Sequence, residues 1–280
     1  MSNKNLIYLI VVFLVLNIFS WGIIFERLIL KEKVAFLNVG QADSEIIITK
    51  AGNILIDAGS KRVVQEIQNV LPFFEKTIDI FILSHPDRDH FLGIFDILNR
   101  YKIRLVVLKD LKDTNTLFQE FLKLVKQKKI LVILPLKALK ISYEGNNNLL
   151  VFSTNNLKQK STSQSSLIAL YSFEGFHFLF TGDIDQYLEN QLKPILKNLV
   201  SKIEVLKVAH HGSKSSSSKE FLNFIKPRFA VIETGINNYG HPHQEAIERL
   251  KEAGATIFRT DLDGSVVFTI KGNNLIYSLK

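Results

Sequence analysis

Hydrophobic and polar positions divide the chain into an uncharged N-terminal run and a longer region of short apolar segments. The run extends from Leu6 to Ile24. After it, β-branched segments separated by Gly, Asp and Asn indicate strands, and segments with helical apolar spacing indicate helices. The predicted strands are 34–39, 44–49, 53–59, 78–83, 103–108, 130–134, 149–153, 166–173, 176–180, 203–208, 229–234, 256–258, 265–270 and 275–277. The predicted helices are 63–74, 91–100, 116–128, 186–200, 219–225 and 244–253.

The order of these elements predicts an α/β fold, a four-layer αββα sandwich over residues 34–280. The first strands follow one another without intervening helices, and strands then alternate with amphipathic helices. Strands that are apolar on both faces indicate two sheets packed together and covered by helices outside. A doubly wound parallel sheet agrees less well because the first strands form a meander. The polar stretch 155–166 is interpreted as a loop inside one domain.

The N-terminal run predicts one transmembrane helix, a membrane anchor covering residues 1–30. At 1.5 Å per residue, a helix of this length nearly spans a hydrocarbon core of about 30 Å. Trp21 near its C-terminal end suits the aromatic belt of a membrane interface. A cleaved signal peptide fits less well, because the run lacks an A-x-A-like site and is longer than a signal h-region. A buried core helix usually needs fewer consecutive apolar residues.

Composition narrows the possible partners and ligands. The chain has 280 residues, 46% of them hydrophobic and 22% charged, which suits one folded domain of ordinary size. A formal net charge of +8 favours an anionic partner such as nucleic acid or a lipid surface. Cysteine is absent, so disulfides and thiolate ligands are excluded and any metal must be held by histidine and carboxylate.

Polar residues with ligand chemistry follow four of the predicted strands. The stretch "SHPDRDH", from Ser84 to His90, follows one apolar strand, and Asp57, Asp183 and the His210–His211 pair follow three others. Imidazole and carboxylate suit zinc, manganese or iron. One such strand end is usually an ordinary polar turn, but four in this order indicate a metal site.

The same residues resemble the metallo-β-lactamase fold hydrolases, and more narrowly the metallo-β-lactamase-like domain of the ComEC competence proteins. The resemblance covers about Val34 to Ile270. Its motifs are "FLNVGQAD" (36–43), His85-x-Asp87-x-Asp89-His90, Gly182-Asp183, "LKVAHHGSKSSSS" (206–218), "NNYGHPH" (237–243) and "RTDLDG" (259–264). The multi-spanning channel region that ComEC proteins carry beside this domain has no counterpart in the chain.

The resemblance implies one or two divalent ions, zinc or manganese, and a role for each ligand. His85 and Asp87 hold the first metal position, Asp89, His90 and His210 hold the second, and Asp183 bridges the two. Asp57, Asp43 and His211 support the ligands from behind, with His211 expected to point to the other side of an extended segment.

The chain departs from the family's pattern at three places. The histidine that many relatives supply before the Gly-Asp strand is replaced by Gln164-Ser165-Ser166, so the first metal position is expected to be weaker. His177 lies nearby but within a strand pattern. In the motif usually written DVGQGD, Asn38 removes a carboxylate and Ala42 adds a methyl group, which could alter the loop's geometry.

Two further segments suit the substrate side of such a site. His241 lies in "YGHPH" at the start of a helix, where it could donate a proton to a leaving oxygen, contact phosphate, or only begin the helix. Ser213, Lys214 and Ser215 could hold phosphate oxygens with His243, or form a flexible loop. Asp89 and His241 are the candidate catalytic residues.

These features predict a membrane-anchored, metal-dependent hydrolase, a phosphodiesterase or nuclease acting on DNA. The alternatives are a hydrolase of small esters, lactones or nucleotides and a non-catalytic DNA-binding subunit of an uptake apparatus. A separate membrane channel protein is a possible partner. The flanking charges slightly favour a body inside the cell, but the resemblance implies DNA processing outside the membrane, so we expect an extracytoplasmic body.

Overall fold

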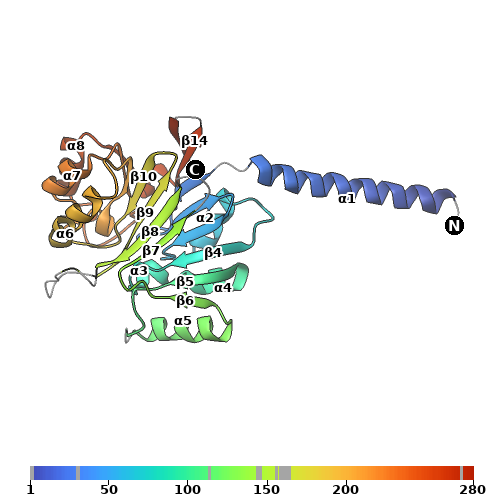
Figure 1. The fold of residues 1–280 in the computed structure, drawn as a ribbon, viewed down its shortest axis with the longest axis horizontal. Coiled ribbons are helices and arrows are strands. Elements are labelled where there is room, and N and C mark those ends of the chain that lie inside the picture. The colour runs from blue at the N-terminus through green and yellow to red at the C-terminus, as the bar shows by residue number, and fades with distance from the viewer. Residues whose placement is uncertain are drawn as a thin grey trace.

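The computed structural model describes residues 3–29, 32–112, 115–142, 147–154, 157, 165–271 and 274–280. Two sheets face each other with helices on both outer surfaces, and helix α1 (Asn3–Ile29) projects from the body (Figure 1). The four-layer αββα sandwich predicted from the sequence is confirmed. Helix α1 contains a stretch, Lys4–Gly22, that is long and apolar enough to cross a membrane.

The first sheet has the strand order β15-β14-β1-β2-β3-β4-β5-β6. Its strands are β1 (Lys33–Phe36), β2 (Glu45–Thr49), β3 (Gly52–Ile56), β4 (Thr77–Ile82), β5 (Lys102–Val107), β6 (Leu131–Ile133), β14 (Val266–Lys271) and β15 (Asn274–Leu279). β1 and β3 are both antiparallel to β2, and β3 to β6 are parallel to one another. β1, β3, β4, β5 and β6 therefore all run in the same direction.

The second sheet has the order β13-β12-β11-β10-β9-β8-β7. Its strands are β7 (Ala138–Ser142), β8 (Asn148–Ser153), β9 (Leu167–Phe173), β10 (Phe176–Phe180), β11 (Val205–Lys207), β12 (Phe229–Ile232) and β13 (Thr256–Arg259). β10 to β13 are parallel. The parallel strands of both sheets end on one side of the molecule, which we call the site edge. They begin on the opposite side, which we call the strand-start edge.

The helices lie on the outer faces of the sheets. They are α2 (Val63–Val70), α3 (Arg88–Phe91), α4 (Ile94–Arg100) and α5 (Thr116–Gln127) beside the first sheet, and α6 (Gln186–Lys197), α7 (Lys219–Ile225) and α8 (Gln244–Glu252) beside the second. A short helix, α9 (Thr260–Asp263), follows β13, and a 3₁₀ turn, η2 (Ala209–Gly212), follows β11.

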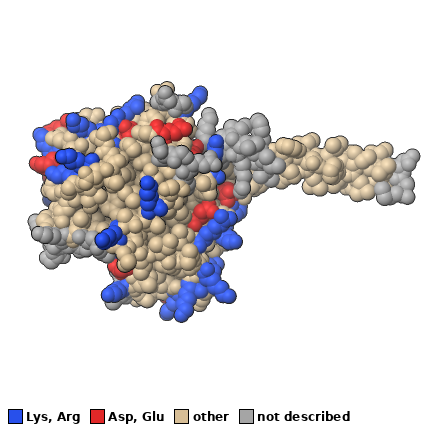
Figure 2. Space-filling view, in the orientation of Figure 1, with Lys and Arg blue, Asp and Glu red and all other residues tan. Residues whose placement is uncertain are grey.

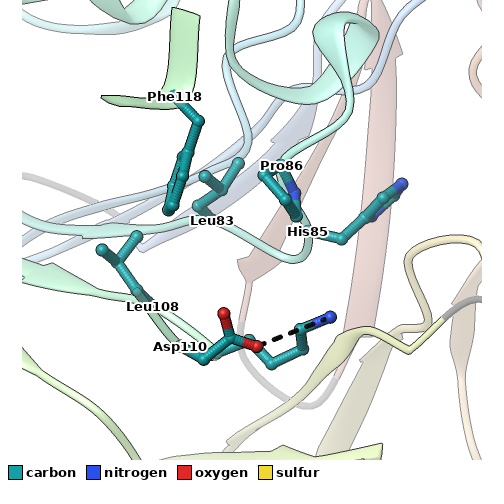
Figure 3. A pocket seen from close by; sticks show the side chains of 7 residues that line it. Leu83, His85, Pro86, Leu108, Asp110 and Phe118 are labelled. Carbon is teal, nitrogen blue, oxygen red and sulfur yellow. Dashed lines mark ion pairs between the residues drawn. The ribbon is translucent and has the colours of Figure 1, made fainter. Parts of the chain in front are cut away.

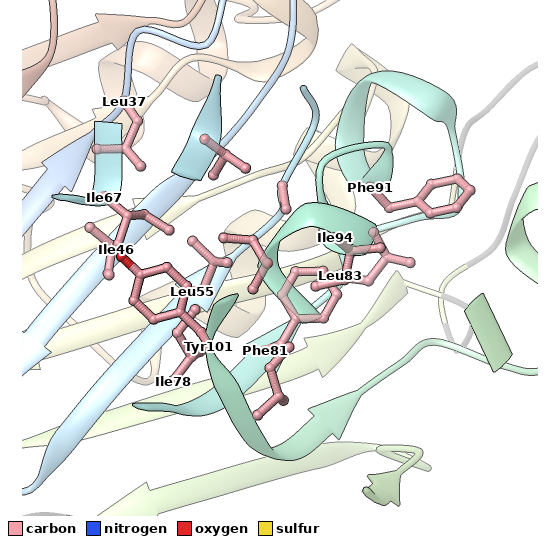
Figure 4. Packing of buried hydrophobic residues seen from close by; sticks show 14 of the residues in the cluster. Leu37, Ile46, Leu55, Ile67, Ile78, Phe81, Leu83, Phe91, Ile94 and Tyr101 are labelled. Atoms are coloured by element: carbon pink, nitrogen blue, oxygen red, sulfur yellow. The ribbon is translucent and has the colours of Figure 1, made fainter. Parts of the chain in front are cut away.

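Alternation along the strands divides the core into layers. In β1, Val34 and Phe36 belong to the cluster between the sheets, whereas Ala35 belongs to the cluster that packs under α2, α4 and α5. This is the two-residue period of a strand that is buried on both faces. Figure 4 shows part of the outer cluster, including Ile46, Leu55 and Phe81 of the sheet against Ile67 and Ile94 of the helices. A third cluster lies under α6, α7 and α8.

Two predicted helices differ from the structure, and one strand was not predicted. The helix expected over 63–74 ends at Val70, and the chain then turns at Pro72, which leaves Phe73 and Phe74 outside it. The helix expected over 91–100 is two short helices, α3 and α4, because the metal-site loop itself winds into the first. Strand β7 was not predicted, because its exposed, lysine-containing sequence lacks a buried apolar face.

Candidate metal centre

The candidate ligands lie together at the site edge, where they follow the ends of strands. Asp57 follows β3, His85 follows β4, Asp183 follows β10, and the histidine pair lies in η2 after β11. In α/β sheets the carboxyl ends of parallel strands are the usual place for a ligand site. The packing of the two sheets thus brings together side chains separated by more than a hundred residues.

Asp57 organises the first part of the site. Its backbone has a left-handed φ of 53°, which turns the carboxylate back toward β4. There it accepts hydrogen bonds from the Ser84 backbone N–H at 2.7 Å and the Ser84 hydroxyl at 2.6 Å. Its Oδ2 also lies 2.7 Å from Nδ1 of His90. This contact fixes the His90 ring and leaves Nε2 facing the site, as carboxylates do behind metal-binding histidines.

Gly59 holds the ligand loop close to this strand end. A Cβ at Gly59 would lie 1.8 Å from the backbone oxygen of Asp89. The same oxygen accepts a hydrogen bond from the Asp43 backbone N–H at 3.0 Å. Ala42, at the position where relatives usually have glycine, is buried and is not among the residues with positive φ. Its methyl group is therefore accommodated without left-handed backbone strain.

Four buried side chains converge on one point. Asp43, His90, Asp183 and His211 each offer a ligand atom, and these atoms all lie within 4.8 Å of one another. Nε2 of His90 is 3.5 Å from Oδ1 of Asp183. Both of those atoms are buried and lack a hydrogen-bond partner. Because an unpaired buried polar atom is costly, each such atom needs an explanation.

A second group of ligands surrounds the other oxygen of Asp183. Nε2 of His85 and Nε2 of His210 each lie 3.8 Å from Oδ2 of Asp183. Asp87 lies 3.8 Å from the same His85 atom, and its side chain is 53% exposed. Asp183 thus stands between the two groups, the position from which a carboxylate can bridge two ions.

The two consecutive histidines are not in an extended segment, contrary to expectation. Both have left-handed backbone angles, with φ of 51° at each, inside the turn η2. His211 is buried, with Nδ1 2.8 Å from the Glu233 backbone oxygen and Nε2 3.3 Å from Oδ2 of Asp89. The side chain of His210 is 36% exposed. The turn therefore directs both rings toward the site, and His211 is the more tightly held of the two.

Known proteins are similar to this chain in sequence and in fold. The sequence profile of the metallo-beta-lactamase superfamily matches residues 37–235. The chain belongs to the metallo-beta-lactamase superfamily. ComE operon protein 3 of Bacillus subtilis is 29% identical over 85% of this chain, and Recombination protein 2 of Haemophilus influenzae is 27% identical over 88%. The chain spans about a third of the length of these relatives, 33% and 31% respectively.

The motif-based resemblance to competence proteins is thereby confirmed. Among solved structures, the metallo-beta-lactamase fold protein YhfI from Bacillus subtilis aligns with a TM-score of 0.58 at 11% identity. That alignment covers 89% of this chain and 100% of YhfI. At such low identity the likeness shows the fold alone.

Behind the ligands of this superfamily member lies a buried charge network that the sequence analysis missed. The Lys207 ammonium, fully buried at the end of β11, forms an ion pair with Asp43, and Oδ1 of Asp43 lies 3.2 Å from Nδ1 of His211. Glu45 and Glu233 are buried beside this pair. A lysine inside an apolar strand was the only sequence signal, and its partners come from three other segments.

Burial sets the protonation of these carboxyl groups. Burial raises the pKa of Glu45 to about 8, although Lys207 opposes the shift. Burial and the neighbouring Glu45 raise the pKa of Glu233 well above its ordinary value. For Asp43, burial is outweighed by the positive charges of Lys207 and His211, which lower its pKa. The network thus combines one carboxylate whose ionised form is stabilised by Lys207 with two carboxyl groups whose protonated form is favoured by burial.

The histidines differ in protonation when no metal is bound. Burial, together with the adjacent His90, lowers the pKa of His85 to about 3. Burial also opposes charge on His90 and His211, but surrounding carboxylates outweigh it. They raise the pKa of His90 well above its ordinary value and that of His211 to about 10. Protons on these two rings therefore balance the carboxylates of the metal-free site.

The region that lacks the usual third histidine is filled by small polar groups. Gln164 lies outside the described residues. Ser165 and Ser166 are buried, and the Ser166 hydroxyl accepts a hydrogen bond from the Asp183 backbone N–H at 3.4 Å. Figure 3 shows His85 among the residues that line a small pocket. Lys109 also lines this pocket, and its ammonium donates to the Ser165 carbonyl at 3.2 Å. His177 instead contacts the Ser172 hydroxyl at 2.9 Å within the second sheet.

The residues predicted for the substrate side differ in their exposure to solvent. Lys214 and Ser215 are exposed, and the Lys214 backbone N–H donates to Nδ1 of His243 at 3.3 Å. Ser213 is buried and its hydroxyl lies 2.9 Å from that of Ser215. The serines that follow have structural partners: Ser216 donates to the Ile184 carbonyl, and Ser218 caps α7. The segment is therefore held in place by α6 and α7.

His241 lies beside the ligand histidines. Its ring centroid is 5.3 Å from that of His210 and 6.1 Å from that of His211. Burial and these neighbouring rings lower the pKa of His241 to about 4. At neutral pH the ring is neutral, so it can donate an N–H hydrogen bond to a phosphate oxygen but carries no extra proton.

The residues present fit a divalent metal. Their donor set is imidazole nitrogen and carboxylate oxygen, which suits zinc, manganese or iron. Buried Nε2 atoms of His85 and His90 and Oδ1 of Asp183 lack hydrogen-bond partners and face one another. Coordination of a divalent ion would satisfy all three atoms at once.

Proposed function

We propose that this superfamily member is a membrane-anchored, metal-dependent hydrolase that cleaves phosphodiester bonds in DNA. The observation that carries the proposal is the set of unpartnered, buried histidine and carboxylate atoms around Asp183. The fold supports hydrolysis, and the names of two relatives, ComE operon protein 3 and Recombination protein 2, point to DNA.

The ligands divide into two positions around Asp183. His90, Asp183, Asp89 and His211 hold the stronger position, and His85, Asp87 and His210 form the weaker one with Asp183. Bound divalent ions, zinc or manganese, lower the pKa of water to about 7 and stabilise charge on an attacked phosphoryl group. At the stronger position His211 here replaces His210, which the resemblance had assigned there. The contact between Nδ1 of His211 and a backbone carbonyl is the arrangement usual for a ligating histidine.

The remaining residues act on the substrate and on the proton. Asp89 orients the attacking water and accepts its proton, because its carboxylate is 41% exposed and lies 3.3 Å from Nε2 of His211, beside the proposed ligands. His241 donates an N–H hydrogen bond to a phosphate oxygen in its neutral form. Lys214 and Ser215 bind the next phosphate along the strand. Tyr239, which is 73% exposed and stacks on His241 at 5.8 Å, offers a face to a base.

The chain is anchored through α1, with residues 34–280 as the hydrolase domain outside the cytoplasmic membrane. The uncharged span supports the anchor. The outward orientation rests on the resemblance to competence proteins alone. We expect a separate membrane channel protein as its partner.

The test uses the full chain purified in detergent. Metal content is measured by mass spectrometry, and cleavage of labelled single- and double-stranded DNA is followed with added Mn²⁺, Zn²⁺ or Mg²⁺. We expect metal-dependent cleavage that chelation abolishes and Asp183→Asn eliminates. Asp110→Asn, which removes a nearby carboxylate outside the cluster, should retain activity.

Two other results would replace the proposal. Bound metal with hydrolysis of an ester, lactone or nucleotide, and intact DNA throughout, would identify a small-molecule hydrolase. Purification without stoichiometric metal, with DNA binding that a chelator leaves unchanged, would identify a binding subunit.

A further inference from the structure

Two phenylalanines are exposed on the turn between α2 and β4. Phe73 is 80% exposed and Phe74 is 43% exposed. The turn is well defined, because the Glu75 backbone N–H donates to the Pro72 carbonyl at 2.9 Å and Leu71 is buried beneath it. Two adjacent aromatic side chains held outward by an ordered turn are unfavourable in water. They indicate a surface that is normally covered.

This turn contacts the candidate membrane span. The rings of Phe74 and Phe19 meet edge to face, with centroids 5.2 Å apart and an interplanar angle of 83°. Phe19 lies three residues before Gly22, the last residue of the span, which corresponds to about 4.5 Å along a helix. The turn therefore reaches the depth at which the span leaves the hydrocarbon.

The sheet topology is independent evidence that the turn lies on the same side of the body as the anchor. β1 and β4 run in the same direction, so the chain that enters β1 from α1 and the turn that enters β4 both lie at the strand-start edge. The metal centre lies at the opposite edge, past the end of β4. β4 has six residues, which corresponds to about 20 Å.

Basic residues surround the turn at this edge. Figure 2 shows Lys and Arg side chains outnumbering acidic ones over β4 to β6 and α5. Exposed lysines at the strand-start edge of the first sheet are Lys50, Lys76, Lys102, Lys128, Lys129 and Lys271. Juxtamembrane lysines are attracted to an anionic lipid surface.

We propose that the Phe73–Phe74 turn is a second membrane contact, which inserts into the anionic lipid surface beside α1. The inference rests on the anchor described under the proposed function and goes beyond it. The two contacts hold the strand-start edge against the bilayer, and they keep the metal centre at the far edge, facing water.

The absence of cysteine from the chain allows a direct test on the full-length protein. Single cysteines are introduced as Phe73→Cys, Leu136→Cys and Leu9→Cys and labelled with an environment-sensitive fluorophore. Leu136 is the matched control, because it is 87% exposed and lies after β6 at the site edge. Each protein is reconstituted into phosphatidylcholine vesicles with or without phosphatidylglycerol, and quenching by brominated lipid is measured.

We expect blue-shifted, lipid-quenched emission from the labels at 9 and 73, and water-like, unquenched emission from the label at 136. Phosphatidylglycerol should increase quenching at 73 several-fold more than at 9. Quenching at 9 with water-like emission at 73 would overturn the second contact and leave the anchor intact. Equal quenching at 73 and 136 would also overturn it, because the body would then have no fixed edge on the bilayer. A water-exposed label at 9 would overturn the anchor itself.

Discussion

At the scale of single residues, the structure bears on the two adjacent histidines, of which the resemblance assigned His210 as the metal ligand and placed His211 behind it. An extended segment would send His210 and His211 to opposite sides, so one of them would point away. The turn η2 instead brings both toward the site. His211 is buried against Asp89 and a backbone carbonyl, whereas His210 is partly exposed.

We therefore predict different effects of the two histidines on metal content. His211→Asn should remove the more tightly bound ion and abolish hydrolysis, because it takes away one of the four ligands proposed for that position. His210→Asn should keep roughly one ion bound and lower activity partially. Metal per chain, measured after dialysis, distinguishes them, and circular dichroism checks that both variants fold. Equal loss in the two variants would contradict the assignment.

Proton release provides a second prediction at this scale. Without metal, His90 and His211 are protonated at neutral pH because their pKa values are raised, that of His211 to about 10. A ligating histidine must lose its proton, so binding at pH 7.5 should release about two protons. Metal affinity should rise with pH up to about pH 10, the pKa of His211. Titration calorimetry in two buffers of different ionisation enthalpy measures the release. No buffer dependence would contradict the raised pKa values.

At the scale of elements, the close approach of the Asp57–Ser60 loop to α3 positions the ligand loop. Gly59→Ala would force its methyl group against the Asp89 carbonyl, which a Cβ would approach to 1.8 Å. We predict a loss of about 1–3 kcal/mol in unfolding free energy, the usual cost of overpacking, together with strongly reduced hydrolysis. Gly22→Ala adds the same methyl group where nothing lies within 4 Å, and it should change neither quantity. Denaturant unfolding measures the unfolding free energy, and a DNA cleavage assay measures hydrolysis. If Gly59→Ala changed neither quantity, the contact between Gly59 and Asp89 would not position the loop.

The elements that the sequence predicted correctly are those with a strong apolar period. β4, β9 and β10 were found because they are buried, and the polar residues at their ends identified the site. Strand β7 was missed because its stability comes from pairing with β8, which no local pattern encodes. Likewise, the Lys207–Asp43 pair joins residues 164 positions apart, so only the packing of the two sheets reveals it. The metal assignments to individual residues remain predictions.

At the scale of the whole molecule, the net charge of +8 does not describe one uniform surface. Part of it lies at the strand-start edge, where Lys102 and Lys129 begin or precede strands. Another part lies at the site edge, where Lys61 and Arg62 follow β3, Arg88 begins α3 and Lys214 follows η2. If the first edge faces lipid, only the second is available to DNA that reaches the metal centre.

The last prediction concerns the contribution of these two edges to DNA binding. Affinity for a single-stranded oligonucleotide should fall steeply with salt, because each neutralised phosphate releases counterions. Removing one contacting cation should lower the slope of log K against log salt by about 0.7 for a single strand. We expect this for Arg88→Ala and Lys214→Ala, whose side chains are exposed beside the ligands. Lys102→Ala and Lys129→Ala are the matched controls and should leave the slope unchanged.

Fluorescence anisotropy of the detergent-solubilised full chain measures the slope for all four variants, with metal withheld to prevent cleavage. A reduced slope in the control variants alone would place the DNA along the strand-start edge, where it would compete with the lipid surface for the same lysines.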